Sequence, residues 1–136
     1  MTGLDRKTGL ETLGEAECWA VLGRHQVGRL AVVASGRPDI FPVNYRLADR
    51  SIVVNTAPGT KLAVALLGPA VAFEVDGIDV GGRTGWSVVV HGRAEELTTL
   101  EDLLEAEDLQ IDSWSSQVKG RYLRVVADEI TGRRLP

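Results

Sequence analysis

Short apolar runs rich in β-branched residues recur along the chain and are separated by turn residues. Runs of this length and composition, bounded by glycine, proline or aspartate, are typical of β-strands. They predict six strands, over residues 27–34, 39–47, 51–54, 70–76, 86–95 and 122–127. Tight turns join the first three strands into a meander. A glycine-rich loop over residues 77–85 separates the fourth strand from the fifth.

Three segments have helical spacing instead. Residues 15–23 place their apolar side chains on one face, and residues 60–67 form a helical pattern that Gly68-Pro69 ends. Residues 100–108 carry leucines at helical spacing with acidic residues on the outside. We therefore expect the leucines of this last helix to face the protein.

Six closely spaced strands with only short helices predict a mainly β protein, folded as a closed or nearly closed six-stranded antiparallel barrel. Closure would remove the exposed strand edges that invite aggregation. The long parallel crossovers of a dinucleotide-binding sheet are absent from the pattern. A length of 136 residues suits one domain over residues 1–136.

The composition is that of an ordinary globular protein, and it argues against several classes of partner and of site. A net charge of −4 at pH 7 argues against nucleic acid or an anionic membrane as the main partner. The single cysteine, Cys18, excludes an internal disulfide and a cysteine-based zinc site, and it is typical of a reducing compartment. The acidic N-terminal stretch does not read as a signal peptide, and no apolar run reaches membrane-spanning length. We expect a soluble, cytoplasmic protein.

The segment Asn55-Thr56-Ala57-Pro58-Gly59-Thr60-Lys61 is the strongest candidate for chemistry. It joins a strand to a predicted helix, so free backbone N–H groups and the positive end of the helix dipole meet there. A lysine in the first turn repels that dipole. Its presence makes more sense beside a bound phosphate, with the hydroxyls of Thr56 and Thr60 as further donors. The alternative is a plain strand-to-helix turn with a solvated lysine.

Pro42 lies in the middle of the second predicted strand. Proline cannot donate a ladder hydrogen bond, so this strand is expected at an edge, a bulge or an interruption of the sheet. Backbone groups of Val43 and Asn44 could then turn toward a ligand. Asn44 and Tyr45 place polar side-chain groups in an otherwise apolar strand. A buried asparagine needs hydrogen-bond partners from the backbone or from a ligand. A plain edge strand is the alternative.

Trp86 and Ser87 begin the fifth predicted strand. The indole could cover a planar ring in a partly solvated cleft, although most tryptophans lie in a core or an interface. No catalytic or metal-ligand spacing surrounds His25 or His91, which read as ordinary histidines. The acidic stretch 74–79 and the arginines at 133–134 read as solvated, although the arginines could contact a phosphate.

These separated motifs together resemble one family. The chain is similar to the small flavin-binding split-barrel proteins related to pyridoxamine 5′-phosphate oxidase, especially the subgroup with nitroimidazole-resistance proteins. The order and spacing of the motifs carry the resemblance, which covers most of the chain. The matching motifs are Glu17-Cys18-Trp19, Val27-Gly28-Arg29-Leu30-Ala31, Gly36-Arg37-Pro38, Pro42-Val43-Asn44-Tyr45, Thr56-Ala57-Pro58-Gly59-Thr60-Lys61, Phe73-Glu74-Val75-Asp76, Gly85-Trp86-Ser87-Val88-Val89-Val90-His91-Gly92 and Ile130-Thr131-Gly132-Arg133-Arg134.

The resemblance implies an FMN-binding split barrel that forms a homodimer, with two cofactors in clefts between the subunits. Thr60 and Lys61 would hold the flavin phosphate, and the backbone near Asn44 would meet the edge of the isoalloxazine ring. Trp86 would line the cleft. The full predicted cofactor-binding set is Pro42, Val43, Asn44, Tyr45, Thr56, Ala57, Thr60, Lys61, Trp86 and Ser87.

Two departures from the oxidases proper bear on activity. Phe41 stands where the oxidases have an arginine near the phosphate, and their C-terminal substrate-binding segment has no clear counterpart here. The resemblance therefore implies an FMN-dependent oxidoreductase for a small acceptor, such as a nitroaromatic or a quinone, rather than pyridoxamine 5′-phosphate oxidase itself. A flavin would supply the hydride chemistry, which agrees with the lack of an acid–base constellation. The alternatives are a reductase that binds the deazaflavin F420 and a non-enzymatic flavin- or haem-binding module.

Overall fold

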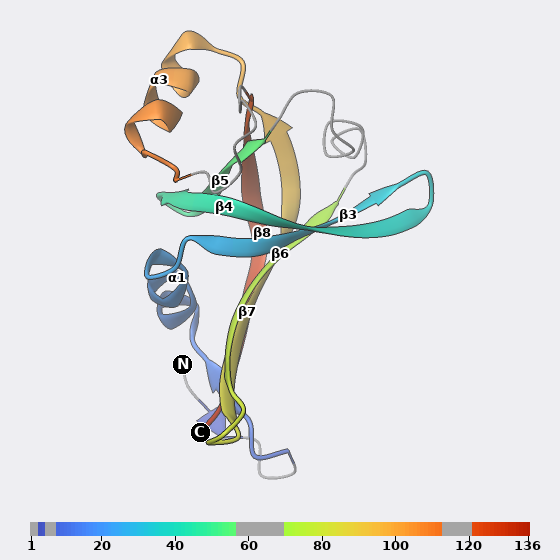
Figure 1. The fold of residues 1–136 in the computed structure, drawn as a ribbon, viewed down its shortest axis with the longest axis vertical. Helices are drawn as coiled ribbons and strands as arrows, with labels where there is room; N and C mark the ends of the chain where they lie inside the picture. Colours follow the sequence, from blue (N-terminus) through green and yellow to red (C-terminus); the bar gives the residue numbers. More distant parts are fainter. Residues whose placement is uncertain (1–2, 5–7, 57–69, 113–120) are drawn as a thin grey trace.

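The computed structural model describes residues 3–4, 8–56, 70–112 and 121–136, and it is built mainly from antiparallel strands (Figure 1). The described residues contain two of the three predicted helices, α1 (Glu15–Gly23) and α3 (Leu100–Asp108), and the predicted helix over residues 60–67 lies outside the described residues. The strands in chain order are β1 (Gly3–Leu4), β2 (Glu11–Leu13), β3 (Val27–Ala34), β4 (Arg37–Ala48), β5 (Ser51–Thr56), β6 (Val71–Asp79), β7 (Thr84–Glu96) and β8 (Arg121–Leu135).

Strands β3 to β8 close into a ring. They neighbour one another in the order β8-β5-β4-β3-β6-β7, and β7 returns to pair with β8. All of these pairings are antiparallel. The predicted six-stranded antiparallel barrel is therefore confirmed. β4 changes neighbour along its length: residues 37–44 pair with β3, and residues 45–48 pair with β5.

The sequence pattern misplaced the ends of several strands. β6 and β7 continue through most of the predicted loop 77–85, which leaves only residues 80–83 as the turn. β8 continues to Leu135, so the prediction of a solvated tail for Arg133 and Arg134 is wrong. Glycines and charged side chains hide the alternation in these segments. Pairing with long neighbouring strands keeps them extended all the same.

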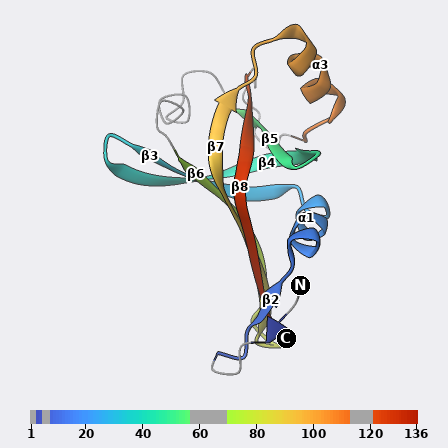
Figure 2. The same cartoon turned by 180° about the vertical axis from the view of Figure 1, so that it is seen from behind.

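β1 and β2 were not predicted at all. They extend the sheet beyond the barrel, because β2 pairs with residues 132–134 of β8 and β1 pairs with β2 (Figure 2). With two and three residues, they are too short to show an alternating pattern.

The main core fills the barrel and continues under α1. Tyr45 and Phe73 are fully buried and meet edge to face, with ring centroids 4.9 Å apart. α1 packs on β8, where Cys18 lies over Gly132. A Cβ at position 132 would lie 2.6 Å from the Cys18 sulfur, so glycine permits this close approach. Burial raises the pKa of the Cys18 thiol, as does the nearby charge of Glu17.

A smaller core lies between α3 and the outer side of β5 and β8. It consists of Val53, Leu97, Ala106 and Tyr122, with Leu103 packed against it. Leu100 and Leu104 are 74% and 57% exposed, so the prediction that all three leucines face inward is wrong. The Thr99 hydroxyl caps the helix by accepting a hydrogen bond from the backbone N–H of Asp102. In the described part of the chain, no helix has the length and apolar character to cross a membrane.

Candidate functional site

Among the described residues, β4 has a strand on one side only at Pro42. Pro42 is in register with Arg29 of β3, and pairing with β5 begins at Tyr45. Proline is tolerated at such an edge, so the predicted position of Pro42 in the sheet is confirmed.

The residues around Pro42 divide between two faces. Val43 and Tyr45 are buried in the core, whereas Pro42 is exposed and Asn44 is half-buried. The Tyr45 hydroxyl donates a hydrogen bond of 2.6 Å to the carbonyl oxygen of Leu22 at the end of α1. Burial raises the pKa of Tyr45 to about 12. The Tyr45 side chain thus joins β4 to α1, and a contact between Tyr45 and a cofactor stays a prediction for its backbone.

Arg46 and Asn55 extend the outer face of β4 and β5. Arg46 is in register with Val53, and Asn55 follows two residues later, so both side chains leave the sheet on the same side. The Arg46 Nε and Asn55 Oδ1 atoms are buried, and neither has a hydrogen-bond partner among the described residues. Buried polar atoms without partners cost about 1–3 kcal/mol each, so this face calls for a ligand or a further polar group.

Thr56 follows Asn55 at the end of β5 and is 5% exposed, and its side chain leaves the sheet on the opposite side, that of Val54. The remaining members of the predicted anion seat, Ala57, Thr60 and Lys61, lie outside the described residues. The two unpaired atoms fit a flavin, because its hydroxylated side chain can donate to Asn55 Oδ1 and its oxygens can accept from Arg46 Nε. The sequence pattern placed Asn55 in the candidate segment but gave neither Asn55 nor Arg46 a part in holding a flavin, because their burial depends on strand pairing.

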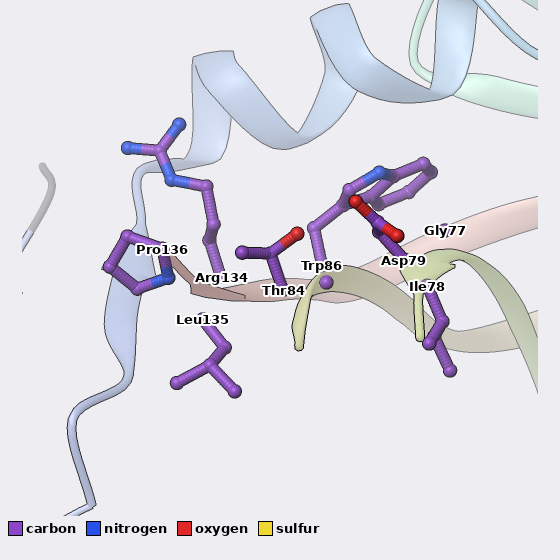
Figure 3. Close-up of a pocket in the computed structure, with 9 residues that line it drawn as sticks. Gly77, Ile78, Asp79, Thr84, Trp86, Arg134, Leu135 and Pro136 are labelled. Atoms are coloured by element: carbon purple, nitrogen blue, oxygen red, sulfur yellow. The ribbon is translucent and has the colours of Figure 1, made fainter. Parts of the chain in front are cut away.

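Trp86 lies at the other end of the molecule, on β7. It pairs with Gly77 of β6 and with Arg134 of β8. Figure 3 shows the Trp86 and Arg134 side chains on the side of the sheet that faces α1, with Leu135 on the opposite side. A cavity of about 360 Å3 lies along these strand ends, and Trp86 is among its lining residues (Figure 3).

Ser87 faces away from α1 and lies near an ionic cluster that the sequence reading treated as solvated. It is in register with Asp76, and it lines a groove of about 280 Å3 together with Glu74 and Asp76. Arg29 Nη1 lies 3.4 Å from a carboxylate oxygen of each acid, so these two acids are paired and the expectation of simple solvation is wrong. Desolvation raises the pKa of Glu74 to about 7, with a further rise from its hydrogen bond to Asp76.

The predicted site residues therefore fall into two separate groups. Thr56 is in register with Arg121 at the start of β8, and Trp86 is in register with Arg134 near its end. At about 3.3 Å per residue, these two positions lie roughly 40 Å apart along one strand. One copy of the chain does not bring Thr56 and Trp86 to the same flavin mononucleotide.

The barrel and the polar face at β4 and β5 define the flavin-binding split-barrel class. The chain matches the family model described as pyridoxamine 5′-phosphate oxidase over residues 14–134. It belongs to this family.

Solved structures agree with this assignment. An FAD-binding protein from Mycobacterium smegmatis is 35% identical, with a TM-score of 0.78 over 90% of this chain and 96% of that chain. An FAD-binding protein from Mesorhizobium loti is 29% identical, with a TM-score of 0.80 over 92% of this chain and 97% of that chain. A candidate 5-nitroimidazole antibiotic resistance protein from Bacteroides thetaiotaomicron has a TM-score of 0.73 over 93% of this chain and 89% of that chain. Its 13% identity shows the shared fold alone.

Proposed function

We propose that this protein binds FMN and uses it to reduce a small acceptor such as a nitroaromatic or a quinone. The observation that carries the flavin assignment is the pair of buried atoms, Arg46 Nε and Asn55 Oδ1, which have no hydrogen-bond partner among the described residues. Membership of the family and the FAD-binding names of two similar structures support a flavin.

The protein's own part in this function is to bind and orient. When bound, a flavin supplies hydride transfer, so the chain needs no nucleophile or metal of its own. The side chains of Arg46 and Asn55 would hold the polar side chain of the flavin, with the backbone of Thr56 next to them, while Lys61 and Thr60 would take its phosphate. The backbone at Pro42 and Asn44, on the singly paired part of β4, would lie along the edge of the ring.

We also propose a homodimer in which the partner supplies the second half of each cleft. The separation of Thr56 from Trp86 supports this arrangement, because a second copy could bring its own Trp86 and Ser87 to the flavin. The outer face of β3 and β4 supports it as well, since Val33 and Ile40 are 51% and 68% exposed there. Large apolar side chains that gather on one face mark interaction surfaces.

Two measurements test the proposal. Purified protein incubated with FMN and passed over a desalting column should keep the absorption bands of oxidised flavin. Bands of a deazaflavin or of haem instead, or no retained chromophore, would contradict the FMN assignment. Light scattering should give twice the mass of one chain with flavin present. A monomer at micromolar concentration would contradict the shared cleft.

Acceptor reduction is tested separately. The flavin-loaded protein, reduced anaerobically, should be reoxidised by a quinone or a nitroaromatic faster than free reduced FMN at the same concentration. Equal rates would leave a flavin-binding protein without this activity.

A further inference from the structure

A second groove, of about 320 Å3, lies between α1, the start of β7 and the end of β8. Among the described residues of the predicted cofactor set, Trp86 alone lines it. Its volume is within the range of small-molecule sites. One face of α1 forms a wall, with Glu17 and Arg24 about two turns apart, and Trp86 and Arg134 come from the strands.

The Trp86 ring is held in the wall of this groove by its neighbours. Gly77 lies directly across the β6–β7 pair, and its missing Cβ leaves room for the indole against β6. The His25 ring lies against the indole, with ring centroids 4.8 Å apart and planes tilted by 36°. The exposed His25 ring on the indole offers an aromatic surface on which a planar heterocycle can stack.

The charged side chains of the groove differ in the hydrogen bonds and ion pairs that they already form. Arg134 is committed to Glu11, with a 3.0 Å hydrogen bond from Nε. Arg24 forms no side-chain hydrogen bond or ion pair within the described part of the chain, so its guanidinium can bind an anion. The Glu17 carboxylate has several acceptor positions and can take a further donor.

We propose that this groove binds an adenine nucleotide. The purine would stack on the His25 ring that lies on Trp86, its exocyclic amino group would donate to Glu17, and its phosphate would accept from Arg24. Glu17 and Arg24 are seven positions apart, about 10 Å at the helical rise, which suits a purine with its ribose between them. A simple anion would bind Arg24 but would be repelled by the Glu17 carboxylate. An aminopurine phosphate can contact the aromatic surface, donate to Glu17 and accept from Arg24 at the same time.

Two ligands contain an adenine and a phosphate of this kind: a free mononucleotide, and FAD through its adenylate half. The FAD source rests on the proposed flavin function and on a second copy of the chain, because Thr56, the described residue of the predicted anion seat, lies at the far end of β8. The mononucleotide source rests on neither. Binding measurements with AMP and with the two flavins therefore separate them.

The direct test titrates the full chain with AMP and with IMP, following the indole N–H signal of Trp86 by NMR. AMP should shift this signal, and IMP, which lacks the amino group, should bind at least about 5-fold more weakly. The variant R24Q should weaken AMP binding about 10-fold or more, since it removes a charge-assisted hydrogen bond. R37Q, which changes an exposed arginine on the β3–β4 hairpin, is the matched control and should bind AMP as the parent does.

The proposal is overturned if AMP leaves the Trp86 signal unmoved at about 10 mM, if IMP binds equally well, or if R24Q and R37Q behave alike. If AMP is found to bind, the two flavins are then compared in its absence. A preference for FAD over FMN that R24Q abolishes identifies the dinucleotide as the source. Equal affinities for FAD and FMN identify a free nucleotide. If no flavin binds while AMP does, the proposed function fails and the nucleotide site stands.

Discussion

Gly77 and Trp86 lie opposite each other on β6 and β7, and a Cβ added at Gly77 would lie 2.5 Å from the indole nitrogen of Trp86. This distance is shorter than any ordinary contact, so the position of the Trp86 ring depends on the absence of a side chain at position 77. Trp86 is also shared by the cavity at the strand ends and the groove under α1. A single glycine thus shapes both spaces.

We predict that Gly77→Ala displaces the Trp86 indole and destabilises the fold by about 1–3 kcal/mol, the usual cost of overpacking. The emission maximum of tryptophan fluorescence should shift, and urea denaturation should give the loss of stability. Gly81→Ala is the control, because a Cβ there meets its nearest atom at an ordinary 3.6 Å. Identical spectra and stability for both variants would show that the ring position does not depend on Gly77.

Tyr45→Phe tests whether the tyrosine serves the core or the cofactor. Loss of the hydrogen bond to the Leu22 carbonyl should lower the free energy of unfolding by about 1 kcal/mol. The affinity for FMN should stay within about twofold of the parent protein, since the side chain is turned away from the outer face. Tyr122→Phe, which loses a 2.9 Å hydrogen bond to Glu107, is the matched control for stability. A large loss of flavin affinity in Tyr45→Phe alone would place the hydroxyl at the cofactor.

The Glu74 carboxyl should make stability depend on pH. Its pKa is raised to about 7, so between pH 4.5 and pH 7 the folded protein keeps a proton that the unfolded chain releases. The free energy of unfolding should therefore fall as pH rises through this window. Solvent screening at the partly exposed side chain reduces the effect to on the order of 1 kcal/mol.

Glu74→Gln should remove this pH dependence. In urea denaturation at pH 5 and pH 7.5, the variant should gain stability relative to the parent at the higher pH. Glu129→Gln, an exposed acid on β8, is the control and should leave the slope unchanged. If the parent and Glu74→Gln keep parallel pH profiles, the retained proton is not on Glu74.

The sequence predicted the barrel because local pattern and strand pairing agree there. α1 and α3 have the predicted bounds, and the six barrel strands are all present. The contacts that the sequence analysis did not foresee join residues far apart in the chain, which local pattern does not contain. The Tyr45 hydroxyl bonds to the end of α1, and Glu74 on β6 is paired with Arg29 on the neighbouring strand β3.

Lys61 carries the phosphate part of the flavin proposal, although it lies outside the described residues. A charge-assisted hydrogen bond contributes about 1.5–3 kcal/mol, so Lys61→Ala should weaken FMN binding roughly 10- to 150-fold. Thr60→Ala should cost less, about 1 kcal/mol, because water replaces a neutral hydroxyl well. Fluorescence titration gives both affinities. Unchanged FMN affinity in a folded Lys61→Ala protein would remove the anion seat.

The flavin-loaded protein should fail as a pyridoxamine 5′-phosphate oxidase despite its family. A phosphorylated substrate needs a cluster of cationic donors facing the flavin, because an unpaired phosphate is expensive to desolvate. Two arginines near Trp86 and Ser87 are engaged with acids of this chain: Arg29 with Glu74 and Asp76, and Arg134 with Glu11. Arg46 is assigned to the flavin itself. Incubation with pyridoxamine 5′-phosphate and oxygen, followed for pyridoxal 5′-phosphate, should give no turnover above free FMN. Turnover on the order of one per second would show that a substrate phosphate site exists after all.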